Sequence, residues 1–141
     1  MIIKTKGIVL NYIKYKESSI ICKIYTQSHG LQSFIVNGVR KSKNSQLSIY
    51  QPLNTIDLIF YMKKNSTLHR IKESKIHQIY KSLHIKISKI SICFFLSEFL
   101  SKVLSSEEDQ NKKFQFISKS IHDFDKIEND FNDFHIKFLI K

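Results

Sequence analysis

The stretch that decides the fold of this chain is LQSFIVNGVRKSKN, residues 31–44. Its first half alternates in the manner of a β-strand, with Phe34 and Val36 on the face opposite to Ile35. Gly38 tolerates backbone angles that a side chain would forbid, so the strand can end sharply there. The second half carries three cations among turn-forming residues, and we expect it to be an exposed basic loop.

Four further strand patterns flank this stretch, separated by turn formers. We expect strands over residues 3–13, 20–26, 53–61 and 67–74, and a short helical turn over residues 46–51. Gly7 lies inside the first strand, where a glycine often marks a bulge or a bend at which a sheet closes on itself. Pro52 is the only proline, and we expect it to open the fourth strand because it cannot donate to a central ladder.

After these strands the spacing of the apolar residues changes to that of a helix. One helical stripe comprises Ile92, Phe95, Leu96, Phe99, Leu100, Val103 and Leu104. Residues 105–109 supply a cap and first-turn acids for a second helix. That helix carries Phe114, Ile117, Ile121 and Phe124. Asp125 could cap a last helix with the stripe Ile127, Phe131, Phe134 and Phe138.

Together these patterns predict an α+β chain. Five strands joined by short turns favour a small closed barrel, and the longer interval before the fourth strand suits a five-stranded OB-type Greek-key barrel better than an SH3-like one. We therefore expect an OB-fold nucleic-acid-binding domain over residues 1–78 and a small α-helical domain over residues 79–141. Because the last apolar pattern ends without a glycine or proline stop signal, we expect the helical domain to be truncated.

Charge is distributed unevenly along the chain. Residues 1–80 hold 13 lysines and arginines against three acidic residues, whereas residues 81–141 hold 10 lysines against nine acidic residues. The formal net charge of +11 points toward polyanions or anionic membrane surfaces rather than acidic small substrates. A lysine-rich genome composition could contribute to the total, but it does not explain the asymmetry between the halves.

Several functional classes find no support in the sequence. Cys22 and Cys93 stand alone inside apolar runs, so each reads as a small core residue in a reduced, cytosolic chain. The six histidines show no metal-ligand spacing, and the three glycines build no nucleotide-binding loop. No nucleophile–base pair is visible. We therefore expect a non-catalytic protein without a metal or cofactor.

Targeting and membrane-spanning segments are likewise not indicated. The start of the chain, MIIKTK, is interrupted at once by lysines and does not read as a secretory signal. The most apolar window, residues 90–104, contains charged and polar side chains and is too short to span a bilayer. We expect a cytoplasmic protein.

Several short pieces of the first eighty residues resemble the N-terminal domain of the RecO family of bacterial recombination mediators and DNA repair proteins. The matching pieces are TKGIVL (5–10), ESSI (17–20), YT (25–26) with HG (29–30), GVRK (38–41) with Lys43, QPL (51–53) and IKE (71–73). The order and spacing of these pieces make the resemblance specific, and FLSEFL (95–100) looks like the family's first long helix.

The resemblance implies both a fold and an activity. RecO proteins pair an N-terminal OB-fold with a C-terminal helical domain, bind single- and double-stranded DNA, and anneal complementary strands. They contact the C-terminal tail of single-strand binding protein and work with RecR to load the recombinase, so a bacterial, nucleoid-associated location is expected. Family members are longer than this chain and many carry a zinc-binding cysteine cluster, which this sequence lacks.

The candidate DNA-binding residues are the cations expected around the barrel, because lysine and arginine track a phosphate backbone without reading bases. The basic loop contributes Arg40, Lys41 and Lys43. The first hairpin adds Lys6, Lys14, Lys16 and Lys23, and the turn after the fourth strand adds Lys63 and Lys64. The plainer interpretation is a solvated surface that keeps the protein soluble.

Aromatic rings are a second way to hold single strands, because bases stack on them. Tyr12, Tyr25, Phe34 and Tyr61 are the candidates, although core packing is the more frequent role of such rings. Two other functions fit the same pattern: an RNA-binding OB module linked to translation, and a protein-interaction adaptor whose lysines are incidental.

Overall fold

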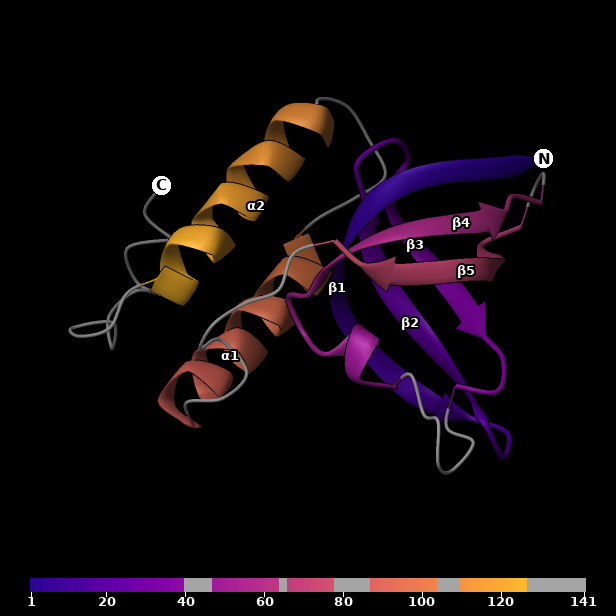
Figure 1. Cartoon of the computed structure of the whole chain (residues 1–141), viewed down its shortest axis with the longest axis horizontal. Coiled ribbons are helices and arrows are strands. Elements are labelled where there is room, and N and C mark those ends of the chain that lie inside the picture. The colour runs from indigo at the N-terminus through magenta and orange to yellow at the C-terminus, as the bar shows by residue number, and fades with distance from the viewer. Residues whose placement is uncertain (40–46, 64–65, 78–86, 104–109, 127–141) are drawn as a thin grey trace.

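The described part of the chain forms five strands followed by two α-helices, and Figure 1 shows their arrangement. The computed structural model describes residues 1–39, 47–63, 66–77, 87–103 and 110–126. The strands are β1 (Ile2–Tyr15), β2 (Ser19–Thr26), β3 (Gly30–Val36), β4 (Thr55–Tyr61) and β5 (Leu68–Ile76). A short 3₁₀ helix, Leu47–Tyr50, precedes β4, and the α-helices are α1 (Ile87–Val103) and α2 (Gln110–Lys126). The expected order of strands, helical turn and helices is confirmed.

The strands close into a barrel with the order β1-β2-β3-β5-β4. All neighbouring strands are antiparallel except β3 and β5, which run parallel. Strand β1 is long enough to pair with β4 through its first half and with β2 through its second half. This is the expected five-stranded OB-type barrel.

Gly7 stands where β1 passes from one neighbour to the other, since it pairs with both Thr26 of β2 and Ile56 of β4. A Cβ added here would lie 2.4 Å from Ile24 Cγ2 and 3.1 Å from Leu58 Cδ2. The glycine is therefore needed for close packing inside the barrel, and a bulge follows at Val9. The expected bend is confirmed.

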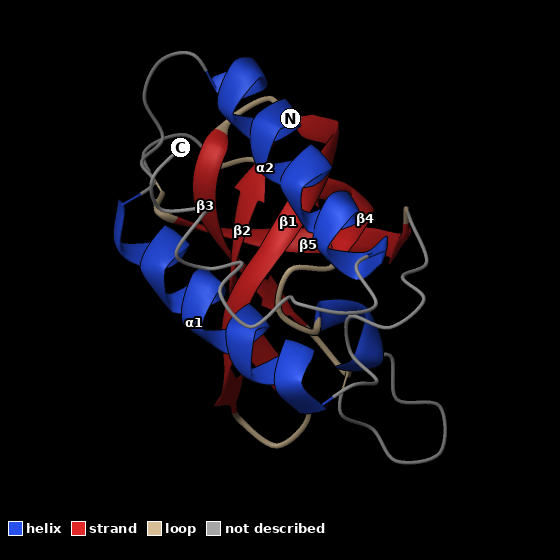
Figure 2. Ribbon diagram, turned by 90° about the vertical axis from the view of Figure 1, so that its left-hand side faces the viewer, coloured by secondary structure: helices blue, strands red, loops and turns tan. Residues whose placement is uncertain are grey.

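Two hydrophobic cores hold the molecule together. The first fills the barrel and includes Ile24, Phe34, Ile56, Leu58 and Phe60. The second joins the barrel to the helices: it contains Ile8, Leu10, Tyr25 and Leu53 from the barrel side, Ile92, Cys93, Leu96 and Leu100 from α1, and Phe114, Ile117, Ile121 and Phe124 from α2. The two described helices consequently cover one side of the barrel, as Figure 2 shows.

The apolar pattern of α2 is confirmed residue for residue. In α1 the burial of Ile92, Leu96 and Leu100 is confirmed and one residue needs correction, while the side chains of Val103 and Leu104 lie outside the described part of the chain. Phe95 was expected on the buried stripe but is 46% exposed, and Cys93 is buried instead. Helix α1 is apolar on nearly every face, so helical spacing alone selects no unique buried side. Both cysteines are buried and neither belongs to a disulfide, as predicted.

The segment before β4 also differs from expectation. Pro52 does not open the strand, because Leu53 adopts a positive φ of 68° and β4 begins only at Thr55. Leu53 is fully buried, and its N–H donates to the Val9 carbonyl over 2.6 Å. The Asn54 amide donates to the carbonyls of Ser48 and Ile49, which lie at the end of the 3₁₀ helix. These contacts hold the turn in place, so β4 begins at Thr55 and not at Leu53.

A buried lysine links the two helices. Lys89 of α1 is fully buried and its Nζ donates to the Asp125 carbonyl of α2 over 3.0 Å. The same Nζ lies 5.4 Å from the centroid of the Phe124 ring. Asp125 belongs to α2, and the last helix that it was expected to cap lies outside the described residues. The same holds for the boundary expected after residue 78 and for the cap at residues 105–109.

Candidate nucleic-acid interface

Every described cation of the first 77 residues is exposed. They are Lys4, Lys6, Lys14, Lys16, Lys23, Lys63, Arg70, Lys72 and Lys75. The only acidic residues in the same stretch are Glu17, Asp57 and Glu73, and Asp57 already has an ion-pair partner in His77 at 3.1 Å. Lys4, Lys23 and Lys75 make no ion pair with any described residue. The barrel surface therefore carries positive charge that is largely uncompensated.

One part of this surface is the outer side of β2 and β3, which we call the strand 2–3 face. Its rows follow from the strand register: Asn11, Lys23 and Ser33 form one row, and Ile13, Ile21 and Ile35 form the next. Two turns belong to the same region of the barrel: the β1–β2 turn, which carries Lys16, and the β4–β5 turn, which carries Lys63. In five-stranded OB barrels, this face and these two loops bind oligonucleotides.

The strand 2–3 face combines charge with exposed apolar surface. Lys23 is exposed in its middle, and Ile13 is 64% exposed on the row beside it. Lys16 adopts a positive φ of 53° at the turn, and its Nζ lies 5.3 Å from the centroid of the Tyr15 ring. Such a surface offers cations to phosphates and flat apolar groups to sugars and bases.

The β4–β5 turn is anchored by a buried histidine. His69 Nδ1 accepts a bond of 3.5 Å from the Lys63 N–H, and His69 Nε2 lies 3.2 Å from Gln32 Oε1. A neutral ring that is protonated at Nε2 satisfies both contacts. Burial, and secondarily the nearby His29, lowers the pKa of His69, which favours this neutral form. The histidine thereby ties the turn that carries Lys63 to strand β3.

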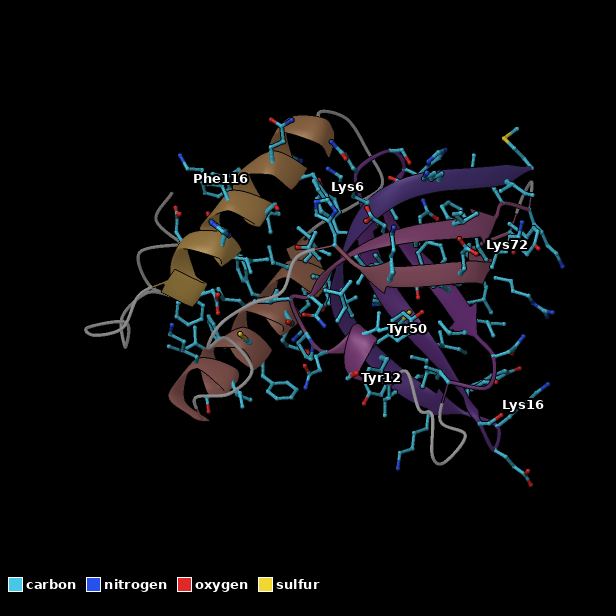
Figure 3. All side chains as sticks on the ribbon, in the orientation of Figure 1. Lys6, Tyr12, Lys16, Tyr50, Lys72 and Phe116 are labelled. Atoms are coloured by element: carbon cyan, nitrogen blue, oxygen red, sulfur yellow. The ribbon has the colours of Figure 1, made fainter. Side chains whose placement is uncertain are left out.

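Two of the predicted cations lie elsewhere. Lys6 points toward α2 and lines a small pocket with Gln115 and Ser118, far from Lys16 at the tip of the first hairpin (Figure 3). Lys14 lines a cleft of about 500 Å³ between β1 and α1. The first hairpin therefore does not present its four lysines as one track. Arg40, Lys41, Lys43 and Lys64 lie outside the described residues.

The aromatic candidates divide in the same way. Phe34 is fully buried in the barrel, and Tyr25 is buried against Phe114 with ring centroids 6.2 Å apart. Both rings therefore pack in the core, and neither is available to stack a base. Burial also raises the pKa of Tyr25. Tyr12 is half-buried against the barrel core. Tyr61, at the end of β4, is 39% exposed and remains a stacking candidate.

Sequence reasoning did not single out four exposed cations of the barrel: Lys4, Arg70, Lys72 and Lys75. Lys4 alternates with half-buried neighbours on β1, and the other three lie on β5. The signal was present, because alternation in the expected fifth strand places Arg70 and Lys72 on the side opposite to Ile71. These residues extend the basic surface around the barrel to β4 and β5.

The described part of the chain also bears on metal binding and on membrane insertion. No group of three or more histidine, cysteine or acidic side chains there could hold a metal ion. None of the described helices is both long and apolar enough to cross a membrane.

Comparison with known proteins places this geometry in a family context. Residues 1–80 match the family described as "Recombination protein O N terminal". The chain is 36% identical to the "DNA repair protein RecO" of Flavobacterium psychrophilum. The match includes the whole of this chain and 60% of the length of that relative. The proteins of the same name from Phocaeicola vulgatus and Prosthecochloris aestuarii are 35% and 31% identical, and the chain covers 59% and 53% of them. It thus spans little more than half the length of these relatives.

Proposed function

This chain belongs to the RecO family of DNA repair proteins, and from that premise we propose that its barrel binds DNA as a non-catalytic component of recombinational repair. The observation that carries the proposal is the strand 2–3 face. It joins exposed cations, among them Lys16, Lys23 and Lys63, to the apolar row of Ile13, Ile21 and Ile35, in which Ile13 is 64% exposed.

Binding would be driven by counterion release. Each lysine that neutralises a phosphate frees a condensed cation, which favours binding at low salt and opposes it at high salt. The apolar row of Ile13, Ile21 and Ile35 would contact sugars and bases without reading their sequence. The protein would therefore bind single strands of different sequence with similar affinity, and duplexes through their phosphates.

The proposed activity is the annealing of complementary strands. Two strands repel each other because both are polyanions, and cations held beside them lower that repulsion while the bases pair. As in the family this chain belongs to, the proposed partners are RecR and the C-terminal tail of single-strand binding protein, and the complex would load the recombinase on DNA. The proposed location is the bacterial cytoplasm, in association with the nucleoid.

A salt titration tests the proposal. Fluorescence anisotropy of a labelled oligothymidine is measured with the wild type and with the variant Lys16→Ala/Lys23→Ala/Lys63→Ala. We expect the logarithm of the wild-type affinity to fall linearly with the logarithm of salt concentration. For single strands the slope changes by about 0.7 per phosphate contact, so the triple variant should lose about two from that slope.

The matched control is Lys113→Ala/Lys119→Ala, which removes exposed lysines from α2 and should bind like the wild type. A wild-type affinity that is insensitive to salt, or no binding at low salt, would refute the proposal. Competition with an RNA oligomer of equal length distinguishes DNA binding from the RNA-binding alternative. If RNA displaces the labelled oligothymidine more effectively than unlabelled DNA does, the RNA-binding alternative is favoured. A protein adaptor would bind neither nucleic acid.

A further inference from the structure

The basic surface of the barrel is divided into two faces that point away from each other. In the ring order β1-β2-β3-β5-β4, strand β4 lies across the barrel from the pair β2 and β3. The outer side of β4 and its neighbours, which we call the strand 1–4–5 face, is therefore separate from the strand 2–3 face.

Cations gather on the strand 1–4–5 face in register. Three rows cross it: Ile2, Tyr61 and Arg70; Lys4, Ile59 and Glu73; and Lys6, Asp57 and Lys75. A bulge in β5 leaves Lys72 without a cross-strand partner, and its side chain is exposed. Four cations thus share this face with the carboxylates of Asp57 and Glu73, because Lys6 of the third row points toward α2, and His77 engages Asp57.

This face also has the shape and apolar groups that a nucleic-acid strand requires. A depression of about 140 Å³ lies between Lys4 of β1 and Lys75 of β5, and Ile59, Asp57 and Glu73 also line it. Tyr61, 39% exposed, and Ile2, 55% exposed, stand on the row beside it. The two lysines can contact phosphates at the borders of the depression, and the exposed ring can stack a base without reading its sequence.

We propose that the strand 1–4–5 face binds a second DNA segment, so that one chain bridges two strands. The proposal rests on the proposed function, because it assigns the second strand of the annealing reaction to its own surface. Two segments held by one small barrel are brought to an effective concentration on the order of millimolar, and pairing can begin where they extend beyond it. Arg70 lies on the border of the two faces, since it pairs with both Ile35 and Tyr61.

The test counts DNA strands per protein chain. An oligothymidine of about eight nucleotides is short enough to occupy one OB-type face. Sedimentation equilibrium of the whole chain at low salt should show two oligomers per wild-type chain. The variant Lys4→Glu/Lys75→Glu should bind one, with its affinity for that oligomer within about twofold of the tighter wild-type site.

Annealing of complementary oligomers supplies the second readout. The Lys4→Glu/Lys75→Glu variant should anneal at least tenfold more slowly than the wild type, whereas the charge-matched control Lys113→Glu/Lys119→Glu should not. Because Lys75 stands opposite Asp57, Lys4→Gln/Lys75→Gln serves as a milder variant that should show the same stoichiometry.

A wild-type stoichiometry of one, or a stoichiometry of two in either face variant, would overturn the bridging proposal and leave DNA binding by the strand 2–3 face intact. Equal annealing rates in wild type and variants would overturn it as well. If the wild type binds no oligomer at all, both the bridging proposal and the proposed function fail.

Discussion

At the scale of single residues, Gly7 decides how tightly the barrel closes. It is the point at which β1 pairs with two strands at once, and its missing side chain allows Ile24 and Leu58 to pack against the backbone. The sequence indicated a special position here, because a glycine interrupts an otherwise β-branched strand. It did not indicate which side chains occupy the space.

Substitution of Gly7 by alanine should therefore destabilise the protein. The new Cβ would lie 2.4 Å from Ile24 Cγ2, and overpacking of a core typically costs about 1–3 kcal/mol of unfolding free energy. Urea denaturation measures this loss. In a double-mutant cycle, Ile24→Ala removes the clashing methyl group, so the double variant should lose less stability than the sum of the single variants. Strict additivity would show that the clash is not the cause.

His69 makes a second prediction at this scale, in the pH dependence of stability. Burial and His29 lower its pKa in the folded state, so the unfolded chain binds a proton more readily. The contribution of this residue to stability is therefore fully favourable above about pH 6.5 and is lost as the pH falls below that value. The slope of the unfolding free energy against pH can reach about 1.4 kcal/mol per pH unit for this one proton.

The measurement is urea unfolding between about pH 5 and pH 7.5. The wild type should lose more stability than His69→Gln over this interval, because the variant has no proton to bind at that position. The difference between the two curves reports the proton that His69 binds together with its electrostatic coupling to His29. Parallel curves would mean that the ring is not held neutral.

At the scale of elements, periodicity predicted the strands well and the irregular segments poorly. Alternation put Phe34 and Val36 on the face opposite to Ile35, and the structure shows that their face is the buried one. It could not predict that Leu53 adopts a positive φ, since that conformation depends on its contact with Val9 across the barrel. It also misplaced Phe95, because α1 is apolar on several sides.

The contact between α1 and α2 yields a prediction of its own. A helix leaves its last carbonyls without backbone partners, and a cation is favourable beside them. Lys89→Met keeps the length of the side chain but removes the donor to the Asp125 carbonyl, so we expect a loss of about 1–3 kcal/mol in unfolding free energy.

Hydrogen exchange localises this effect. Amides in the last turns of α2 should exchange faster in Lys89→Met than in the wild type. The control is Lys102→Met, which changes an exposed lysine of the same helix and should shift stability by no more than about 0.5 kcal/mol. Equal stability of both variants would show that Lys89 does not hold α2.

At the scale of the whole molecule, the asymmetry of charge along the chain becomes an asymmetry in space. The sequence predicted that the basic residues belong to the barrel, and the described cations of that half are all exposed on it. It could not predict their division into faces, because that depends on the ring order of the strands and on register. Lys6 and Lys23 both lie on the first hairpin, yet Lys6 faces α2 and Lys23 faces outward between β1 and β3.

The central claim is that the barrel, and not the helical part, is the DNA-binding surface. The most direct measurement is an amide-resolved NMR titration of the whole chain with a short oligothymidine at low salt. The account predicts shifts at Lys16, Lys23, Ser33 and Lys63, with Lys113 and Lys119 of α2 unchanged. Shifts confined to α1 and α2, or no shifts at all, would contradict it.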